Sequence, residues 1–217
     1  MTATLARSPV GMTLDRVSLL SGVRTLTRRD RGLARLVARY GPPPLWARRP
    51  GFTTLLRIIL EQQVTLASAE ALYNRLAVTV RPFDPAGILA LGPTGLQGLG
   101  VTRQKTRYAL ALADQVTSGH LTLRRLGRCS DAEARERLMQ VPGIGPWTAS
   151  SYLLMALRRP DVWPPGDLAL DKALARLYGS AATLRADEVE EVTAPWRPLR
   201  AVAARILWHS YLSERAA

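Results

Sequence analysis

Apolar residues recur along most of the chain at the three- and four-residue spacing of an amphipathic helix. The clearest case begins after Asp30, a residue type that caps helix N-termini, and has apolar side chains at positions 33, 36, 37 and 40. A glycine and three prolines at positions 41–44 follow and are predicted to end this helix.

Further helices are predicted from the same spacing and from N-cap signals. Asp84 precedes a proline, Thr102 precedes a helical pattern, and Ser130 with Glu133 has the form of a capping box. The remaining predicted helices are about Phe52–Glu61, Thr65–Leu76, Thr102–Val116, Ala134–Met139, Trp147–Leu157, Leu168–Tyr178 and Arg200–Ser213. Alternating strand patterns are nearly absent, so the sequence predicts an all-α protein.

The first 29 residues differ from the rest, because Thr13, Val17, Val23 and Leu26 give no clear period. A strand pair, an arm and a disordered segment all remain open. We treat residues 1–29 as an N-terminal arm or short extra segment, and residues 30–217 as the folded body.

The charge of the chain is strongly one-sided. It has 30 Lys and Arg against 17 Asp and Glu, a net charge of +13, and its only lysines are Lys105 and Lys172. The planar guanidinium of arginine binds phosphate through two hydrogen bonds, so this excess is typical of a protein with a polyanionic partner. Arginines on solvated helix faces would give the same count, so charge alone leaves both interpretations open.

The single cysteine, Cys129, excludes a disulfide, a zinc site of several thiolates and a four-cysteine iron–sulfur cluster within the chain. No side chains have metal-ligand spacing, since His120 and His209 are isolated. No apolar run approaches the roughly 18 residues that span a bilayer, and no signal-peptide core is visible. We therefore expect a soluble cytoplasmic protein, nucleoid-associated in a bacterium, with no membrane partner.

The most informative stretch is residues 138–150, which reads LMQVPGIGPWTAS. One helix is predicted to end near Gln140, and another to begin at Pro146, a favourable first helical residue. Gly143 and Gly145 let the turn between them bend sharply and approach a partner closely. The first amides of the second helix lack intrahelical acceptors and suit a phosphate, although an ordinary helix–turn–helix corner has a similar sequence.

This hairpin is followed by Val162-Trp-Pro-Pro-Gly-Asp167, which places Asp167 22 residues after Gly145. Together the two motifs resemble the helix-hairpin-helix superfamily of DNA glycosylases. The 3-methyladenine DNA glycosylase II branch is the most similar, because residues 60–65 (LEQQVT) resemble its early helix–turn and residues 196–208 its C-terminal helix. The resemblance covers about residues 30–213. It implies two helical lobes around a DNA-binding cleft, with the hairpin at residues 138–157.

The function implied by the resemblance is excision of damaged, alkylated bases flipped out of double-stranded DNA, by a monomer. Asp167 would be the catalytic carboxylate, because an ionised carboxylate beside the sugar stabilises the positive charge that develops as the base leaves. A helix N-terminus keeps such an aspartate ionised. An N-cap role is the alternative for Asp167 on local sequence alone, and Asp171 is expected to be a surface or ion-pairing residue.

The resemblance also assigns the other site residues. The pocket for the flipped base would contain Trp147, Trp208, Tyr152, Ser151 and Leu168. The DNA contacts would be Gln62, Gln63, Gly143, Gly145, Pro146, Thr148, Arg103 and Lys105, with Gln63 inserted into the gap left by the flipped base. From the residue types alone, core packing explains the two tryptophans more readily than a base pocket does, and solvent exposure explains the two glutamines equally well.

Main-chain carbonyls of Met139, Val141 and Ile144 would hold a Na⁺ or K⁺ ion that bridges to a DNA phosphate, and no other cofactor is required. Relatives that also nick the strand place a Schiff-base lysine in the second hairpin helix. Here that helix begins Pro146-Trp147-Thr148, so we expect hydrolysis without lyase activity.

Two departures from the branch leave the range of lesions open. Tyrosines often found one turn after the first tryptophan and just after the aspartate are replaced by Ser151 and Leu168. Larger members carry an N-terminal β-rich domain that contributes to the pocket wall, and 29 residues are too few for it.

Three alternative functions remain on the sequence alone. A glycosylase for oxidised or mismatched bases would need polar groups near Trp147 or Trp208 to read base edges. A non-catalytic helix-hairpin-helix DNA-binding module would need the glycines and have no use for Asp167. A helical RNA-binding protein would bind single strands and be indifferent to base damage.

Overall fold

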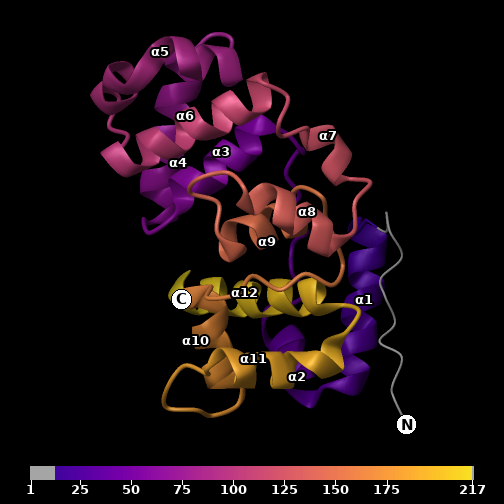
Figure 1. Cartoon of the computed structure of the whole chain (residues 1–217). Helices are drawn as coiled ribbons and strands as arrows, with labels where there is room; N and C mark the ends of the chain where they lie inside the picture. Colours follow the sequence, from indigo (N-terminus) through magenta and orange to yellow (C-terminus); the bar gives the residue numbers. More distant parts are fainter. Residues whose placement is uncertain (1–12, 217) are drawn as a thin grey trace. The chain divides into compact units, whose positions relative to one another are not determined.

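The computed structural model describes residues 13–216, and every regular element in that range is helical. The prediction of an all-α protein is confirmed. The chain divides into two compact units, Met1–Ala47 with Arg158–Ala217 (unit 1) and Arg48–Leu157 (unit 2). The helices of both units are labelled in Figure 1.

Unit 1 is organised around its C-terminal helix. It contains α1 (Arg16–Arg29), α2 (Arg31–Tyr40), α10 (Leu168–Leu177), α11 (Ala186–Thr193), the 3-10 helix η1 (Ala194–Trp196) and α12 (Arg200–Ala216). Helix α12 packs against α1, α2 and α10 (Figure 1). Residues 201–208 of α12 are all buried, as expected for a helix covered by neighbours on several sides.

Arg205 is a buried charge within this helix. Its Nε atom donates to the carbonyl of Leu45 at 2.9 Å, and Nη1 donates to the carbonyl of Ala201 at 2.8 Å. Burial lowers the pKa of Arg205 to about 10, so the guanidinium stays protonated at neutral pH. Arg205 therefore fastens the segment that leaves α2 to the centre of unit 1.

The N-terminal segment is not a separate arm, because residues 16–29 form α1 within unit 1. Asp15 and Ser18 cap α1 reciprocally: Ser18 N–H donates to Asp15 Oδ1 at 2.7 Å, and Asp15 N–H donates to Ser18 Oγ at 2.8 Å. Its buried side chains include Leu19, Val23 and Leu26, which have helical spacing. Polar residues between them hid this period, and residues 1–12 of the expected arm lie outside the described residues.

Unit 2 is organised around α3. Its helices are α3 (Phe52–Glu61), α4 (Leu66–Thr79), α5 (Pro85–Gly98), α6 (Arg103–Thr117), α7 (Leu123–Leu126), α8 (Asp131–Met139) and α9 (Pro146–Met155). Helix α3 packs against α4, α6 and α9 (Figure 1). Between residues 54 and 60 only Arg57 is not buried, and Arg57 and Arg48 both form ion pairs with Glu61.

The predicted N-caps are confirmed at Asp30, Asp84, Thr102 and Ser130. Each side chain accepts a hydrogen bond from a backbone N–H in the first turn of its helix. The short helices α7 and α11 were not predicted, because four and eight residues give too few turns to establish a period. Over the described range, no helix combines the length and apolar character needed to cross a membrane.

The packing of α1 is tested by Leu26→Ala. Leu26 is 0% exposed, so the substitution should lower the free energy of unfolding by about 2–5 kcal/mol. Val17→Ala is the control on the same helix, since Val17 is 74% exposed, and it should change stability by less than about 0.5 kcal/mol. Urea unfolding followed by circular dichroism measures both variants. Equal stabilities for the two would show that α1 does not pack in the core.

Candidate functional site

The predicted hairpin is present in unit 2 between α8 and α9. The turn is closed by Val141 N–H donating to the carbonyl of Leu138 at 3.1 Å and by Ile144 N–H donating to the carbonyl of Val141 at 3.0 Å. Pro146 is the first residue of α9, as predicted. The N-cap of α9 is Gly145, which has no side chain to cap the helix, so the predicted phosphate site at this N-terminus is not filled by a capping side chain.

The two glycines of the hairpin have different reasons to be glycine. Gly143 has φ +89°, and a Cβ atom there would lie 2.2 Å from Cγ of Tyr108 on α6. Gly145 has φ −91° and a Cβ would meet no atom within 4 Å. Gly143 is therefore required by the fold of unit 2, whereas Gly145 leaves open space in front of the helix.

Gln62 connects the end of α3 to the hairpin instead of facing outward. Its Nε2 atom donates to the carbonyl of Gly143 at 2.9 Å and to Oγ1 of Thr148 at 2.8 Å. Thr148 is 2% exposed. The predicted DNA contacts through the side chains of Gln62 and Thr148 are corrected accordingly, because both side chains serve to hold the hairpin.

Lys105 also turns inward. It is 9% exposed, and its Nζ atom donates to the carbonyl of Leu60 at 2.7 Å. Desolvation lowers the pKa of Lys105. The prediction of a phosphate contact at Lys105 is therefore corrected: the ammonium satisfies the C-terminal end of α3. Arg103, two residues earlier on α6, is exposed and remains available to a phosphate.

Gln63 has the geometry of a projecting residue. It is exposed, follows directly on the anchored Gln62, and has φ +56°, a left-handed conformation that is uncommon for a residue other than glycine. Val64 and Leu66 beside it are 45% and 62% exposed. A tip held rigidly at one end and exposed at the other suits insertion into a base stack.

The α9 residues predicted for the base pocket have different environments. Trp147 is partly exposed in the first turn, whereas Ser151 is 2% exposed and Tyr152 is fully buried. The Tyr152 hydroxyl accepts the N–H of Gly51 at 3.0 Å, and burial raises the pKa of Tyr152 to about 12. Tyr152 and Ser151 are buried in unit 2, and their place in the base pocket stays a prediction.

Asp167, predicted as the catalytic carboxylate, and Trp208, predicted for the base pocket, are in direct contact in unit 1. Asp167 is the N-cap of α10, and its Oδ1 atom accepts from Ala169 N–H at 3.1 Å and Leu170 N–H at 3.0 Å. The indole Nε1–H of Trp208 donates to the same oxygen at 3.0 Å. Asp167 is 9% exposed and Trp208 is 7% exposed. The aspartate is thus both an N-cap and an oriented carboxylate.

The two residues that follow Asp167 on one side of α10 differ in exposure and charge. Leu168, the next residue, is 62% exposed. Burial raises the pKa of Asp171, one turn later, and the negative charge of Asp167 raises it further. Asp171, expected to be a surface or ion-pairing residue, is thus a second carboxylate within the electrostatic range of Asp167.

The loop that leads to Asp167 is anchored at its start. Arg200 donates from Nε to Asp161 Oδ1 at 3.0 Å and from Nη2 to Oδ2 at 3.2 Å. Trp163 in this loop packs against Trp196, with ring centroids 6.1 Å apart. The position of Asp167 is therefore fixed from both sides, by this loop and by α12.

Trp46 is the residue that the sequence pattern missed. It lies one residue before Ala47, where the first segment of unit 1 ends. Its ring centroid lies 6.4 Å from that of Trp208 in an edge-to-face arrangement. The sequence did contain a sign of its role. Trp46 lies two residues after a run of three prolines, and such a run forms a rigid extended segment.

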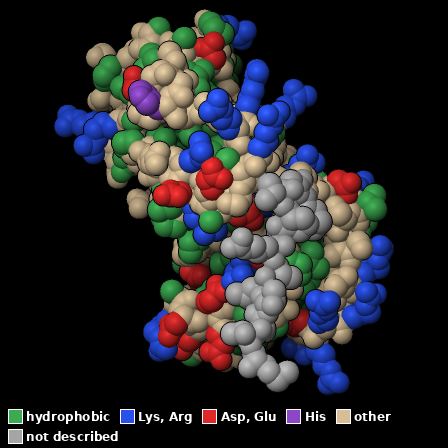
Figure 2. Space-filling model, turned by 45° about the vertical axis from the view of Figure 1, so that its right-hand side comes forward, with side chains coloured by type: hydrophobic (Ala, Val, Ile, Leu, Met, Phe, Trp, Pro, Cys, Tyr) green, Lys and Arg blue, Asp and Glu red, His purple; other side chains and the backbone are tan. Residues whose placement is uncertain are grey.

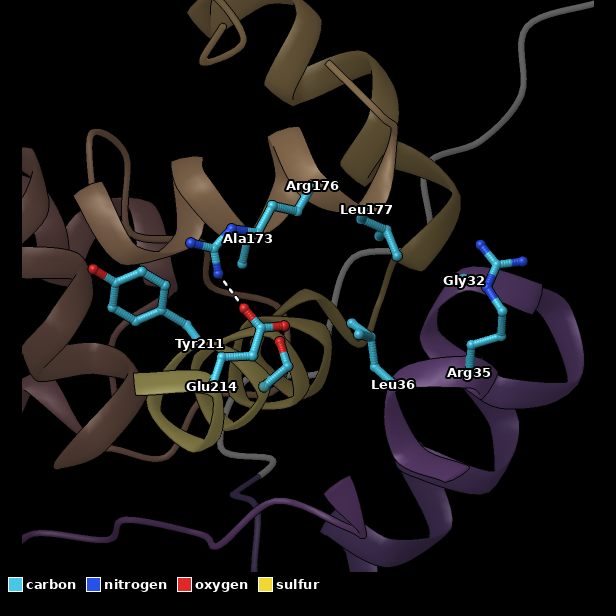
Figure 3. A pocket seen from close by; sticks show the side chains of 9 residues that line it. Gly32, Arg35, Leu36, Ala173, Arg176, Leu177, Tyr211 and Glu214 are labelled. Carbon is cyan, nitrogen blue, oxygen red and sulfur yellow. Dashed lines mark hydrogen bonds and ion pairs between the residues drawn. The ribbon is translucent and has the colours of Figure 1, made fainter. Parts of the chain in front are cut away.

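A cavity of about 170 Å³ opens elsewhere in unit 1, among α2, α10 and α12. Figure 3 shows Arg176 of α10 pointing toward Glu214 of α12, with which it forms an ion pair. The first residue of α10 that lines this cavity is Ala173, which lies well over one helical turn after Asp167. It is smaller than a usual ligand pocket of about 300–1,000 Å³ and is separate from the predicted site.

Lysine and arginine side chains project from much of the face shown in Figure 2. Within the described residues no group of three or more His, Cys, Asp and Glu side chains could hold a metal ion. A two-glycine hairpin ending at an uncapped helix, and a carboxylate held by a helix N-terminus and an indole, define a helix-hairpin-helix protein of the glycosylase type.

The chain belongs to the HhH-GPD superfamily of base excision DNA repair proteins, whose pattern matches residues 56–198. A DNA-3-methyladenine glycosylase of Bacillus subtilis is 29% identical over 169 residues, which are 72% of this chain and 56% of that protein. The chain thus spans little more than half of that relative.

Two solved structures match this chain over nearly their whole length. A 3-methyladenine DNA glycosylase of Schizosaccharomyces pombe in complex with abasic DNA has a TM-score of 0.79 and 26% identity, over 87% of this chain and 95% of that chain. A DNA-3-methyladenine glycosidase of Bacillus halodurans has a TM-score of 0.74 and 26% identity, over 90% of this chain and 91% of that chain.

The hairpin glycines provide a matched test. Gly143→Ala places a Cβ at a positive φ and against the Tyr108 ring, so it should cost about 1–3 kcal/mol of stability and weaken DNA binding. Gly145→Ala should cost less than about 1 kcal/mol, because its φ is negative and the space is open. Thermal unfolding and fluorescence anisotropy with undamaged duplex measure the pair. A loss of equal size at both positions would contradict this assignment.

Proposed function

We propose that this chain is a monofunctional DNA glycosylase that hydrolyses the N-glycosidic bond of alkylated bases, of the 3-methyladenine type, flipped out of double-stranded DNA. The observation that carries the proposal is the carboxylate of Asp167, buried and oriented by two backbone amides and the Trp208 indole. The names of the Bacillus and Schizosaccharomyces relatives support this substrate class.

In this reaction the bond between C1′ of deoxyribose and the base nitrogen breaks, and the base leaves with the bonding electron pair. Positive charge develops on the sugar, and the carboxylate of Asp167 stabilises it. Water then adds to C1′ and loses a proton, which leaves a free base and an abasic site. Alkylation already places positive charge on the base, so the leaving group needs little further activation.

The hairpin supplies the DNA contact in this proposal. The N-terminus of α9, with Gly143, Gly145 and Pro146, would bind a backbone phosphate through main-chain groups and the helix dipole. Arg103 would add a charged contact. These contacts are independent of sequence, as a search for scattered lesions requires.

A monovalent cation fits the hairpin chemically. Main-chain carbonyl oxygens are suitable ligands for Na⁺ or K⁺, and the carbonyl of Val141, which accepts the Ile144 N–H at 3.0 Å, keeps a second lone pair. Met139 and Ile144 would supply the other carbonyls. When bound, such an ion would add positive charge for a phosphate, and the hydrolysis itself needs no cofactor.

Strand cleavage is not part of the proposal, because no lysine is placed for it. Helix α9 carries none, Lys105 is held inward against the carbonyl of Leu60, and Lys172 is exposed on α10. A Schiff base needs an uncharged amine at C1′. We also propose that the protein acts as a monomer in the cytoplasm.

The catalytic role is tested by Asp167→Asn. Asparagine can still accept the bonds from Ala169, Leu170 and Trp208 through its carbonyl oxygen, but it carries no charge. Release of 3-methyladenine and 7-methylguanine from methylated duplex should fall roughly 10²–10⁴-fold, with DNA affinity unchanged. Mass spectrometry of the released bases measures the rate, and gel analysis before and after alkali reports strand breaks. A variant as active as the wild type would refute this role.

The insertion of Gln63 is tested by Gln63→Ala. If its amide hydrogen-bonds the base opposite the lesion, affinity for duplex with an abasic site should fall about 2- to 12-fold. Affinity for undamaged duplex should stay the same. The control is Gln97→Ala, at an exposed glutamine of α5. Equal losses for damaged and undamaged DNA would instead assign Gln63 to general backbone binding.

A further inference from the structure

Trp46 extends the catalytic cluster of unit 1 by one aromatic ring. Its indole contacts Trp208 edge to face, with centroids 6.4 Å apart and planes at 75°, and it lies 6.3 Å from the ring of His209. Trp208 in turn donates to Asp167. Three side chains from distant parts of the sequence thus form a continuous row of a carboxylate and two indoles.

The backbone that carries Trp46 is fastened to α12 on both sides of Trp208. Arg205 donates to the carbonyl of Leu45 at 2.9 Å, and His209 Nε2 donates to the carbonyl of Tyr40 at 2.9 Å. Arg205 and His209 are one turn apart on α12, so these two side chains share a face of the helix, and they flank Trp208 in the sequence. Three prolines stiffen the segment between these anchors. The place of the Trp46 ring is therefore determined by the fold.

Trp46 is also held in a strained conformation. Its φ is +47°, in the left-handed region that bulky residues rarely adopt. Such a conformation costs about 1–3 kcal/mol, and residues that keep it are concentrated at ligand clamps and active sites. The strained backbone of Trp46 is therefore found next to Trp208, the residue that donates to Asp167.

Trp46 is the more accessible of the two indoles. Trp208 is 7% exposed, whereas Trp46 is only partly buried. The indole N–H of Trp208 is donated to Asp167, and Trp46 adds a second, more exposed indole beside the Trp208 ring. The tyrosines expected from the resemblance are absent, since position 151 is a buried serine and position 168 an exposed leucine.

We propose that Trp46 is a specificity-determining residue, whose ring joins Trp208 in recognising a positively charged N-alkylpurine beside Asp167. This inference rests on the proposed glycosylase function. A tryptophan face attracts a cation more strongly than other aromatic rings do, and a neutral purine of the same shape lacks that attraction. Trp46 therefore favours 7-methylguanine and 3-methyladenine over neutral lesions such as hypoxanthine.

The test compares single-turnover release of 7-methylguanine and hypoxanthine from defined duplexes by the wild type, Trp46→Leu and Trp46→Phe. Trp46→Leu should lower the ratio of charged to neutral base release about 3- to 20-fold, and Trp46→Phe should retain part of it. The control is Tyr178→Leu, at an aromatic residue of unit 1 that is 48% exposed. It removes an aromatic ring that the proposal does not use and should leave the ratio unchanged.

The outcomes separate this inference from the function on which it rests. An unchanged ratio in a folded Trp46→Leu protein that still releases both bases overturns the role of Trp46 and leaves the glycosylase proposal intact. If Trp46→Leu does not fold, an unchanged ratio for Trp46→Phe overturns the same role. A wild type that releases no alkylated base overturns both proposals.

Discussion

Three donors converge on a single oxygen, Oδ1 of Asp167: two amides of the first turn of α10 and the indole N–H of Trp208. The amides fix the carboxylate relative to α10, and the indole fixes it relative to α12. Because one atom joins both helices, the orientation of Asp167 depends on their packing, and each element of unit 1 that braces α10 or α12 contributes to it. The N-cap of α10 and the proposed catalytic carboxylate are thus the same side chain.

Helix α12 transmits that constraint to the rest of unit 1. At its start Arg200 holds Asp161, where the loop to Asp167 begins, and in its middle Arg205 holds the segment that carries Trp46. A buried guanidinium is costly unless its N–H groups are satisfied. Here two carbonyls accept from Arg205, which turns a buried charge into a structural connection between distant segments.

Local signals made much of this structure predictable. The caps at Asp30, Asp84, Thr102 and Ser130 depend on contacts within three residues, and the hairpin depends on a short sequence with special backbone angles. The predictions of DNA contacts were wrong where the ends of different helices pack against each other. Gln62, Thr148 and Lys105 look like surface residues in sequence, but they satisfy carbonyls and hydroxyls that tertiary packing brings to them. The contact of Trp46 with Trp208 joins residues too distant for any periodicity to reveal.

The chemistry around Asp167 argues for selection by charge and bond lability instead of by reading base edges. A site that distinguishes bases by their edges needs free hydrogen-bond donors and acceptors. It rejects a wrong base because that base leaves these groups unpaired. The indole N–H of Trp208 is already committed to Asp167, so Trp208 can offer a base only the face or edge of its ring. Ring faces favour cationic purines, whose glycosidic bonds are also the easiest to break. In the proposed reaction, recognition by ring faces and ease of bond cleavage would therefore select the same cationic lesions.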